Sequence, residues 1–359
     1  MRIVLFVHSV VSNWNNGNAH FLRGVARELI ARGHQVVVYE PEDGWSRTNL
    51  LQEPAGAETI AAFEQVFPEL RVVTYGRDLD LEAAVRGASL VVVHEWNDPA
   101  LVREVGELRR KQSFRLLFHD THHRGVTAPA EMARYELTEY DGVLAFGSAI
   151  RDHYLERGWA RRAWTWHEAA DTRLFRPLDR LPHAELVWIG NWGDDERTAE
   201  LHEYLIEPVR RLGLSGSVYG VRYPEDARRG LARAGLSYGG WLPNHRVPEV
   251  FARHRVTVHI PRRPYVAALP GIPTIRPFEA LACGIPLVSA PWRDTERLFA
   301  PGDLRWADDG DEMEEQLRAA LEGPRHVGLA TIRERHTCGH RVDRLLEIVE
   351  ELEEEAVAA

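Results

Sequence analysis

Residues 276–291 combine the residue types best suited to chemistry. The segment reads Arg-Pro-Phe-Glu-Ala-Leu-Ala-Cys-Gly-Ile-Pro-Leu-Val-Ser-Ala-Pro. It predicts a short helix that opens at Pro277 and ends at Gly284, followed by a strand at 285–289, because Pro suits a first helical position and Gly ends helices. Glu279 would then lie in the first turn. There its carboxylate could accept both hydrogen bonds of a ribose diol, while the helix end faces a diphosphate. The alternative is that Glu279 only caps its own helix.

A second polar segment follows the first predicted strand. Asn15, Asn16, Gly17 and Asn18 could form only a turn, since Asn and Gly tolerate left-handed backbone. We favour the interpretation in which Gly17 and Asn18 open a helix whose N-terminus is ready for an anion.

Three histidines are concentrated after a later strand. The run is His119-Asp120-Thr121-His122-His123. Its density suggests a zinc site, which would need three or four ligands. We favour a polar loop that lines a ligand cleft, and we predict no metal.

Buried strands alternate with helices along the chain, and these elements must position the candidate residues. The predicted strands are 3–7, 36–39, 90–93, 115–118 and 142–146, then 185–189, 217–219, 257–260 and 285–289. Apolar strands without polar alternation are typical of parallel sheets with both faces covered. We predict an N-terminal Rossmann-like acceptor domain at 1–178, a Rossmann-like donor domain at 179–340, and a helix at 341–359 that packs back on the first domain. Two doubly wound domains that face each other would bind a ligand at the carboxyl ends of their strands.

Composition narrows the classes of partner. The 359 residues carry a formal net charge of −10, which disfavours a general nucleic-acid binder. Lys111 is the only lysine, so phosphate binding falls to arginine. With only Cys283 and Cys338, no predicted signal peptide and no apolar run of membrane-spanning length, we expect a cytoplasmic protein, at most peripheral to a membrane.

Four blocks of the chain resemble GT-B glycosyltransferases, in particular the retaining branch that uses nucleotide sugars. They are Phe21–Val36, Tyr140–Ser148, Asp171–Pro177 and Phe278–Val288, and the chain also resembles a divergent branch related to spore-coat maturation proteins. The resemblance implies an α/β fold of two Rossmann-like domains facing across a cleft. It further implies a metal-independent, hexosyltransferase-type enzyme without a cofactor. Such an enzyme moves a sugar from a nucleoside diphosphate sugar to a hydroxyl-bearing acceptor (a small molecule, a glycan or a lipid-linked group), with retention of configuration.

The resemblance also assigns residues of the second domain to the donor. Glu279 would bind the ribose, and Arg197 would neutralise the phosphates from the helix after the glycine loop. The remaining donor positions are Gly190 and Asn191 against the phosphates, Arg276, Pro277 and Phe278 at the helix N-terminus, and Trp241 and Leu242 at the base. Buried Trp is usually a core residue, so for Trp241 a core role is the stronger interpretation.

In the first domain, the resemblance places Gly17 and Asn18 at the reaction centre and His119 and Asp120 near the transferred sugar. A retaining reaction needs no dedicated protein base. If the reaction inverts instead, then Asp120, His119 or His20 would have to deprotonate the acceptor.

Two departures from the family keep other functions open. The family usually has a glutamate that holds sugar hydroxyls eight positions before Glu279, where this chain has Gly271, and its phosphate-binding lysine is missing. The alternatives are a non-catalytic nucleotide-sugar-binding partner protein, or an epimerase or phosphorylase on the same fold.

Overall fold

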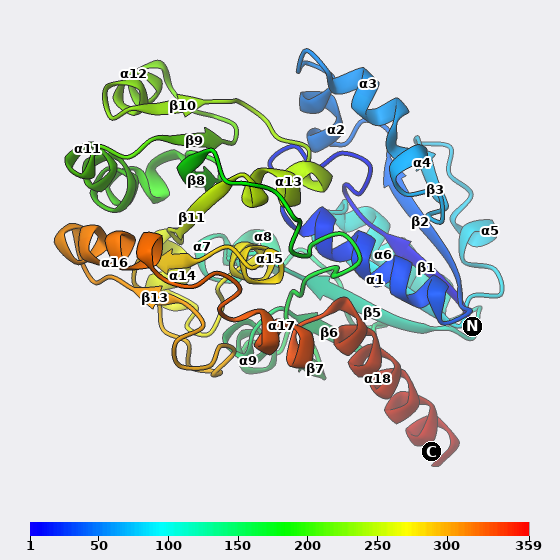
Figure 1. The fold of residues 1–359 in the computed structure, drawn as a ribbon. Helices are drawn as coiled ribbons and strands as arrows, with labels where there is room; N and C mark the ends of the chain where they lie inside the picture. Colours follow the sequence, from blue (N-terminus) through cyan, green and yellow to red (C-terminus); the bar gives the residue numbers. More distant parts are fainter. Residues whose placement is uncertain (359) are drawn as a thin grey trace. The chain divides into compact units, whose positions relative to one another are not determined.

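The computed structural model describes residues 1–358. The chain forms two compact units, which are described separately (Figure 1). Unit 1 consists of Met1–Glu168 together with the segment that starts at Cys338, and unit 2 is Ala169–Thr337.

Unit 1 is built on a parallel sheet of seven strands in the order β3-β2-β1-β4-β5-β6-β7. The strands are β1 (Arg2–Phe6), β2 (Gln35–Pro41), β3 (Val72–Tyr75), β4 (Leu90–His94), β5 (Arg115–Asp120), β6 (Gly142–Ala145) and β7 (Ala163–Thr165). The helices are α1 (Asn18–Ala31), α2 (Trp45–Leu50), α3 (Gly56–Ala61), α4 (Phe63–Val66), α5 (Leu81–Val85), α6 (Pro99–Arg109), α7 (Arg124–Thr127), α8 (Pro129–Met132), α9 (Ser148–Glu156) and α18 (Cys338–Ala358).

Strand β1 is an interior strand of this sheet, and every side chain from Ile3 to Phe6 is buried. Val4 pairs with Val37 on one side and with Val91 on the other, both in parallel register. From β1 the chain first extends the sheet toward β3 and then returns to build it toward β7. The strand order therefore reverses between β1 and β4, and such a switch point opens a crevice at the carboxyl ends of the strands.

Unit 2 repeats this plan with a parallel sheet of six strands in the order β10-β9-β8-β11-β12-β13. The strands are β8 (Ala184–Ile189), β9 (Gly216–Tyr219), β10 (Leu236–Tyr238), β11 (His254–His259), β12 (Leu287–Ser289) and β13 (Arg305–Trp306). The helices and helical turns are η1 (Asp194–Glu196), α10 (Thr198–Leu201), η2 (His202–Ile206), α11 (Glu207–Leu212), α12 (Glu225–Arg233), η3 (Asn244–Arg246), α13 (Val247–Ala252), α14 (Arg263–Ala268), α15 (Ile275–Cys283), α16 (Gly310–Glu322) and α17 (Leu329–Arg335).

Both faces of the unit 2 sheet are buried, as continuous apolar strands predict. Leu186 and Trp188 of β8 belong to a core shared with α11, α12 and α16. Val187 and Ile189 belong to a second core shared with α13, α15 and α17. The switch point of this sheet lies between β8 and β11. The prediction of two Rossmann-like α/β folds is confirmed.

The helical segment that follows the glycine loop after β8 and ends at Leu212 is interrupted. It consists of η1, α10, the π-helical segment η2 and α11. Pro208 has no N–H and its ring crowds the carbonyl four residues earlier, so a regular α-helical hydrogen bond cannot form there. The wider π turn immediately before Pro208 accommodates this defect.

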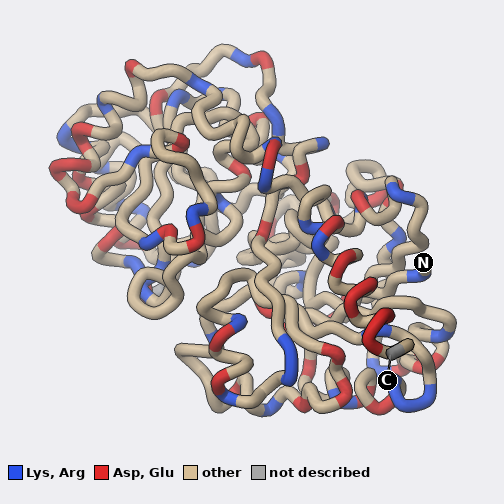
Figure 2. The backbone as a smooth tube through the Cα atoms, turned by 90° about the horizontal axis from the view of Figure 1, so that it is seen from below, with Lys and Arg blue, Asp and Glu red and all other residues tan. Residues whose placement is uncertain are grey.

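Helix α18 completes unit 1 and lies beside α1 (Figure 1). Its buried side chains are Val342, Leu345, Ile348, Val349 and Leu352. Acidic residues become frequent along this helix toward the C-terminus (Figure 2).

Candidate active site

Arg197 spans the switch point of unit 2. Its Nη1 donates to the carbonyl of Ile260, just after β11, at 3.0 Å, and its Nη2 donates to the carbonyl of Asn191, just after β8. Gly193, with φ 81°, makes room for this side chain, because a Cβ at that position would lie 2.8 Å from Nε of Arg197. The glycine loop after β8 therefore fixes the arginine at the carboxyl edge of the sheet.

The charge of Arg197 has no direct counter-ion among the described side chains. Arg197 is only 9% exposed, its Nε has no hydrogen-bond partner, and it forms no ion pair with a described carboxylate. Burial, followed by the positive charge of Arg262, lowers its pKa to about 9, and the charge of Arg276 acts in the same direction. A buried cation with a spare donor and positive neighbours is suited to binding an anion.

His259, the last residue of β11, adds a neutral donor or acceptor beside these arginines. Its Nδ1 lies 2.9 Å from Oγ of Ser289, while its Nε2 is buried without a partner. Burial, followed by the charge of Arg197, lowers the pKa of His259 to about 3. The neutral ring can hydrogen-bond a ligand without adding charge.

Helix α15 starts earlier than the sequence predicts. It begins at Ile275 rather than Pro277, and no acidic residue lies in its first turn, so the placement of Glu279 in that turn is wrong. Thr274, at φ 62° and ψ −174°, turns the chain into the helix two residues before the proline. Pro277 stays within the first turn, where its missing N–H costs no helical hydrogen bond. The open N–H groups at the helix start therefore include those of Ile275 and Arg276.

Glu279 is fully buried and both of its carboxylate oxygens have partners. Oε1 accepts a hydrogen bond from Nδ2 of Asn244 at 2.8 Å, and Oε2 forms an ion pair with Arg276. These contacts hold Arg276 near the N-terminus of α15. The binding of a ribose to Glu279 stays a prediction.

The other predicted donor residues lie around the same strand ends. The carbonyl of Gly190 accepts a hydrogen bond from the Tyr223 hydroxyl at 2.8 Å, and Oδ1 of Asn191 accepts one from the Val221 N–H at 2.9 Å. Trp241 is half-buried, and its Nε1 is buried without a partner. The two remaining positions, Leu242 and Phe278, both pack in the core on the α15 side. Their contact with a nucleotide stays a prediction. Arg197 lies between η1 and α10 rather than within a helix.

The switch point of unit 1 holds uncharged polar groups instead of arginines. His8 follows β1, and its ring stacks on that of His94, the last residue of β4, at 5.1 Å. Nδ2 of Asn18, at the start of α1, lies 2.7 Å from Nε2 of His94 and 3.2 Å from Oγ1 of Thr121. Oδ1 of Asn18 and Nδ1 of His8 are buried without partners. Gly17 is exposed at the N-cap of α1.

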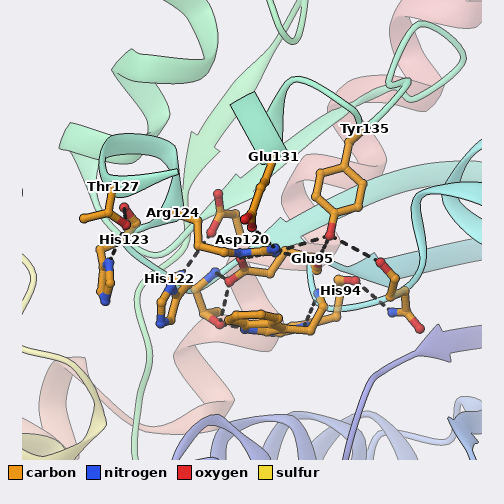
Figure 3. A network of polar contacts seen from close by, with 12 residues as sticks. His94, Glu95, Asp120, His122, His123, Arg124, Thr127, Glu131 and Tyr135 are labelled. Atoms are coloured by element: carbon orange, nitrogen blue, oxygen red, sulfur yellow. Dashed lines mark hydrogen bonds and ion pairs between the residues drawn. The ribbon is translucent and has the colours of Figure 1, made fainter. Parts of the chain in front are cut away.

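Behind this group lies a compact polar network (Figure 3). Arg124 forms an ion pair at 2.9 Å with the fully buried Glu95 and also donates to the Tyr135 hydroxyl at 3.2 Å. Its guanidinium carbon lies 3.9 Å from the centre of the Trp96 ring. The charge of Arg124 is therefore balanced, and its side chain supports the indole.

The three predicted catalytic residues of unit 1 are all buried. His119 is surrounded by the rings of Phe21, His94 and Trp166, and neither of its nitrogens has a partner. Asp120 accepts hydrogen bonds from the Tyr154 hydroxyl at 2.8 Å and from the His122 N–H at 3.0 Å. His20 is 2% exposed in α1. Their catalytic roles stay predictions.

Sequence reasoning missed His8, Glu95 and Trp96 in unit 1. One signal could have found them: each lies within two residues of the end of a buried strand, at the edge where α/β sheets bind ligands. Arg262 follows the end of β11 by three residues. The position of Arg262 next to Arg197 depends on the pairing of β8 with β11, which the sequence does not show.

The described residues contain neither a cluster of metal ligands nor a membrane-spanning helix. Among residues 1–358, no group of three or more His, Cys, Asp or Glu side chains is arranged to hold a metal ion. Within the same range, no helix is both long and apolar enough to span a bilayer.

Comparisons with known proteins agree with this geometry. A family model described as glycosyl transferase-like matches residues 197–347, a segment that starts at Arg197. Sucrose-phosphate synthase from Thermosynechococcus elongatus superposes with a TM-score of 0.66 at 14% identity, over 98% of each chain. HepE from Anabaena, solved with UDP-glucose, gives 0.68 at 12% identity, over 98% of this chain and 100% of its own. An alpha-glucosyltransferase solved with UDP and DNA gives 0.68 at 12% identity, over 98% of this chain and 99% of its own. No curated protein matches the sequence significantly.

At these identities the solved structures establish the fold, which is the GT-B fold of two Rossmann-like domains. The family model adds the class of enzyme through the segment that contains Arg197, Arg262, Arg276 and Glu279. The chain therefore has the GT-B fold, and its segment 197–347 matches a glycosyl transferase-like family model.

Proposed function

We propose that unit 2 binds the diphosphate of a nucleotide sugar between Arg197, Arg262, Arg276 and the N-terminus of α15, and that the sugar is transferred to a hydroxyl of an acceptor. The observation that carries the proposal is the buried Arg197, which bridges the two strand ends at the switch point without a carboxylate partner among the described side chains. UDP or UDP-glucose is bound in HepE, so uridine diphosphate sugars are the first donors to test. The acceptor is a small molecule, a glycan or a lipid-linked group, and the expected location is the cytoplasm.

The arginines would act mainly on the leaving group. When the anomeric bond breaks, negative charge develops on the departing diphosphate. Cations and N–H donors that are already in place stabilise this charge without reorganising. Arg197 is held by two main-chain carbonyls and Arg276 by Glu279. Both guanidinium groups are therefore oriented before the donor arrives.

We further propose that transfer proceeds with retention and without a dedicated protein base. Burial lowers the pKa of His119 to about 3 and leaves both nitrogens enclosed. The carboxylate of Asp120 is buried and occupied by two hydrogen bonds, and burial raises its pKa. Neither group offers an accessible base to an acceptor hydroxyl, which supports a reaction in which the leaving phosphate takes the proton.

For the sugar hydroxyls we propose Glu296 in place of the glutamate that position 271 lacks. A Cβ built on Gly271, which has φ 85°, would lie 2.8 Å from Oε1 of Glu296 and 3.0 Å from Oγ1 of Thr295. A side chain at 271 would be strained by the positive φ and would require the side chain of Glu296 to move. The loop after β12 brings a carboxylate to that position from elsewhere in the chain.

Calorimetric titration of the full chain with UDP tests the donor site. The Arg197→Ala variant should bind UDP about 10- to 100-fold more weakly, because a charge-assisted hydrogen bond contributes about 1.5–3 kcal/mol. Arg210→Ala is the matched control, since Arg210 is exposed on α11 and pairs only with Glu207 among its described contacts. Wild-type affinity in the Arg197 variant would exclude the proposed site.

A non-catalytic nucleotide-sugar-binding protein is the second candidate, and Gly271 is the observation that favours it. The two functions differ in whether the donor is consumed. We expect slow release of UDP from UDP-glucose by the full chain, even when water is the acceptor. Tight binding of UDP-glucose without any release of UDP across a broad acceptor panel would favour the binding protein.

A further inference from the structure

The two switch points are built for different ligands. In unit 2 the strand ends hold Arg197, which has no carboxylate partner among the described side chains, next to Arg262 and Arg276, which pair with Glu196 and Glu279. In unit 1 the nearest cation, Arg124, is paired with Glu95, and the groups at the strand ends are His8, His94 and Asn18. The unit 1 site is therefore polar but has no excess charge to attract an anion, which favours a neutral ligand with many hydroxyls.

Trp96 provides an open aromatic surface at this site. Its side chain is 43% exposed although it directly follows the buried β4 and Glu95. Arg124 lies against the ring at 3.9 Å, and the ring of His122 meets it at 74° with 5.0 Å between centroids. The indole is thus held in place from one side and at its edge. A fixed and exposed aromatic ring is suited to stacking on a flat ligand.

Two buried polar atoms beside this ring lack partners. Nδ1 of His8 is one of them, and the His8 ring lies 6.2 Å from the Trp96 ring. Oδ1 of Asn18 is the other, and Nδ2 of the same amide contacts His94, on which His8 stacks. Buried polar atoms normally have hydrogen-bond partners, so unpartnered ones at a switch point indicate where a ligand would supply them.

We propose that unit 1 binds a pyranose ring of a neutral saccharide acceptor, with the ring stacked on Trp96 and its hydroxyls bonded to Oδ1 of Asn18 and Nδ1 of His8. A pyranose has an apolar C–H face and a polar edge of hydroxyls, which matches one aromatic ring next to unpartnered acceptors. The acceptor role rests on the proposed glycosyl transfer, whereas saccharide binding at Trp96 does not.

Saturation-transfer NMR and calorimetry on the full chain, with saturating UDP and without it, test this site. The probes are the neutral disaccharides maltose, cellobiose, lactose and gentiobiose. We expect at least one to bind, and Trp96→Ala to weaken its binding about tenfold or more, while Trp96→Phe retains most of it. Asn18→Ala should also weaken binding of the same disaccharide. This variant leaves the support of Trp96 by Arg124 in place, because the described side-chain contacts of Asn18 are with His94 and Thr121. The UDP affinity should change less than about twofold in both Trp96 variants.

Trp306→Ala is the matched control, because Trp306 is 39% exposed on β13 of unit 2. Disaccharide affinity that is the same in wild type, Trp96→Ala and Asn18→Ala would overturn the proposal, as would the absence of binding by all four disaccharides in a protein that binds UDP. If disaccharides bind through Trp96 but UDP does not bind, the donor site fails while the saccharide site stands.

Discussion

Single residues in this protein titrate far from their usual range because the fold encloses them. His119 is fully buried among aromatic rings, and burial lowers its pKa from 6.5 to about 3. The unfolded chain therefore binds a proton at His119 near pH 6.5, whereas the folded chain does not bind it until about pH 3. Stability from this residue is complete above pH 6.5 and is lost as the pH falls from 6.5 toward 3.

We predict that His119→Phe removes the contribution of one bound proton from the pH dependence of the free energy of unfolding. Between pH 6 and 4 its free energy of unfolding should fall less steeply than that of the wild type, by about 1.4 kcal/mol per pH unit. At pH 7 the stabilities should be similar, since neither ring nitrogen has a partner to lose. Urea unfolding at pH 7, 6, 5 and 4 measures the slopes. Slopes for His119→Phe that run parallel to those of the wild type would contradict the prediction.

Glu296 carries a second prediction at the residue scale. If its carboxylate holds hydroxyls of the donor sugar, Glu296→Gln should weaken binding of UDP-glucose about tenfold and leave that of UDP unchanged, because only the sugar loses a contact with a charged group. Competition between the two ligands in calorimetry gives both constants. Glu249→Gln, on the exposed side of α13, is the control. An equal loss for UDP and UDP-glucose would mean that Glu296 only supports the loop.

At the scale of elements, the loop after β8 decides whether Arg197 reaches the switch point. Gly193 meets two demands there: its backbone has φ 81°, and its missing side chain leaves space for Nε of Arg197. Gly213, which ends α11 with φ 66°, meets only the first, because an added Cβ would have nothing within 4 Å. Substitutions at these two glycines therefore distinguish the effect of backbone strain from the effect on the position of Arg197.

We predict that Gly193→Ala lowers the affinity for UDP about tenfold or more, whereas Gly213→Ala leaves it unchanged. Both variants should lose about 1 kcal/mol of stability from the left-handed backbone. UDP titration together with urea unfolding distinguishes the two effects. Equal UDP affinities in the two variants would show that the Gly193 side-chain space does not position Arg197.

At the scale of the whole molecule, the chain leaves unit 1 after Glu168 and returns to it at Cys338. The returning helix α18 is tied to unit 1 by polar contacts as well as by its apolar face. Nε1 of Trp166 donates to the Arg341 carbonyl at 2.7 Å, and Nε of Arg341 donates to the His167 carbonyl at 2.8 Å. Unit 1 is thus made of two segments, while unit 2 is one continuous segment.

This connectivity predicts that a cavity in α18 weakens unit 1 alone. Leu345→Ala removes a fully buried side chain and should cost about 2–5 kcal/mol. Hydrogen exchange should accelerate in β1 and α1 but not in β8 or β11. Glu351→Ala, on the exposed side of the same helix, should alter neither unit. Faster exchange throughout unit 2 in the leucine variant would show that the two units unfold together.

The sequence by itself determined where nine of the thirteen strands in residues 1–358 lie, but it missed β3, β7, β10 and β13. Its apolar runs place β1, β2, β4, β5, β6 and β8 within a few residues of their observed bounds, because burial on both sheet faces leaves a purely local pattern. The four blocks that resemble GT-B glycosyltransferases predicted the fold class. Because Lys111 is the only lysine, the sequence also predicted that any phosphate binding would fall to arginine. The sequence singled out Glu279 but placed it wrongly in the first turn of the helix. The residue types around Thr274 do not indicate the turn with positive φ that starts α15 two residues before Pro277.

Tertiary structure alone decided which side chains meet. Arg197 reaches a carbonyl 63 positions away, and Trp96 is supported by an arginine that is itself balanced by Glu95. Glu296 comes to the space that Gly271 leaves empty. Such contacts depend on strand order and loop path rather than on neighbouring residues. For that physical reason the sequence could predict the carboxyl edges of the sheets as candidate sites, but not which arginines meet at one edge and which uncharged and aromatic side chains meet at the other.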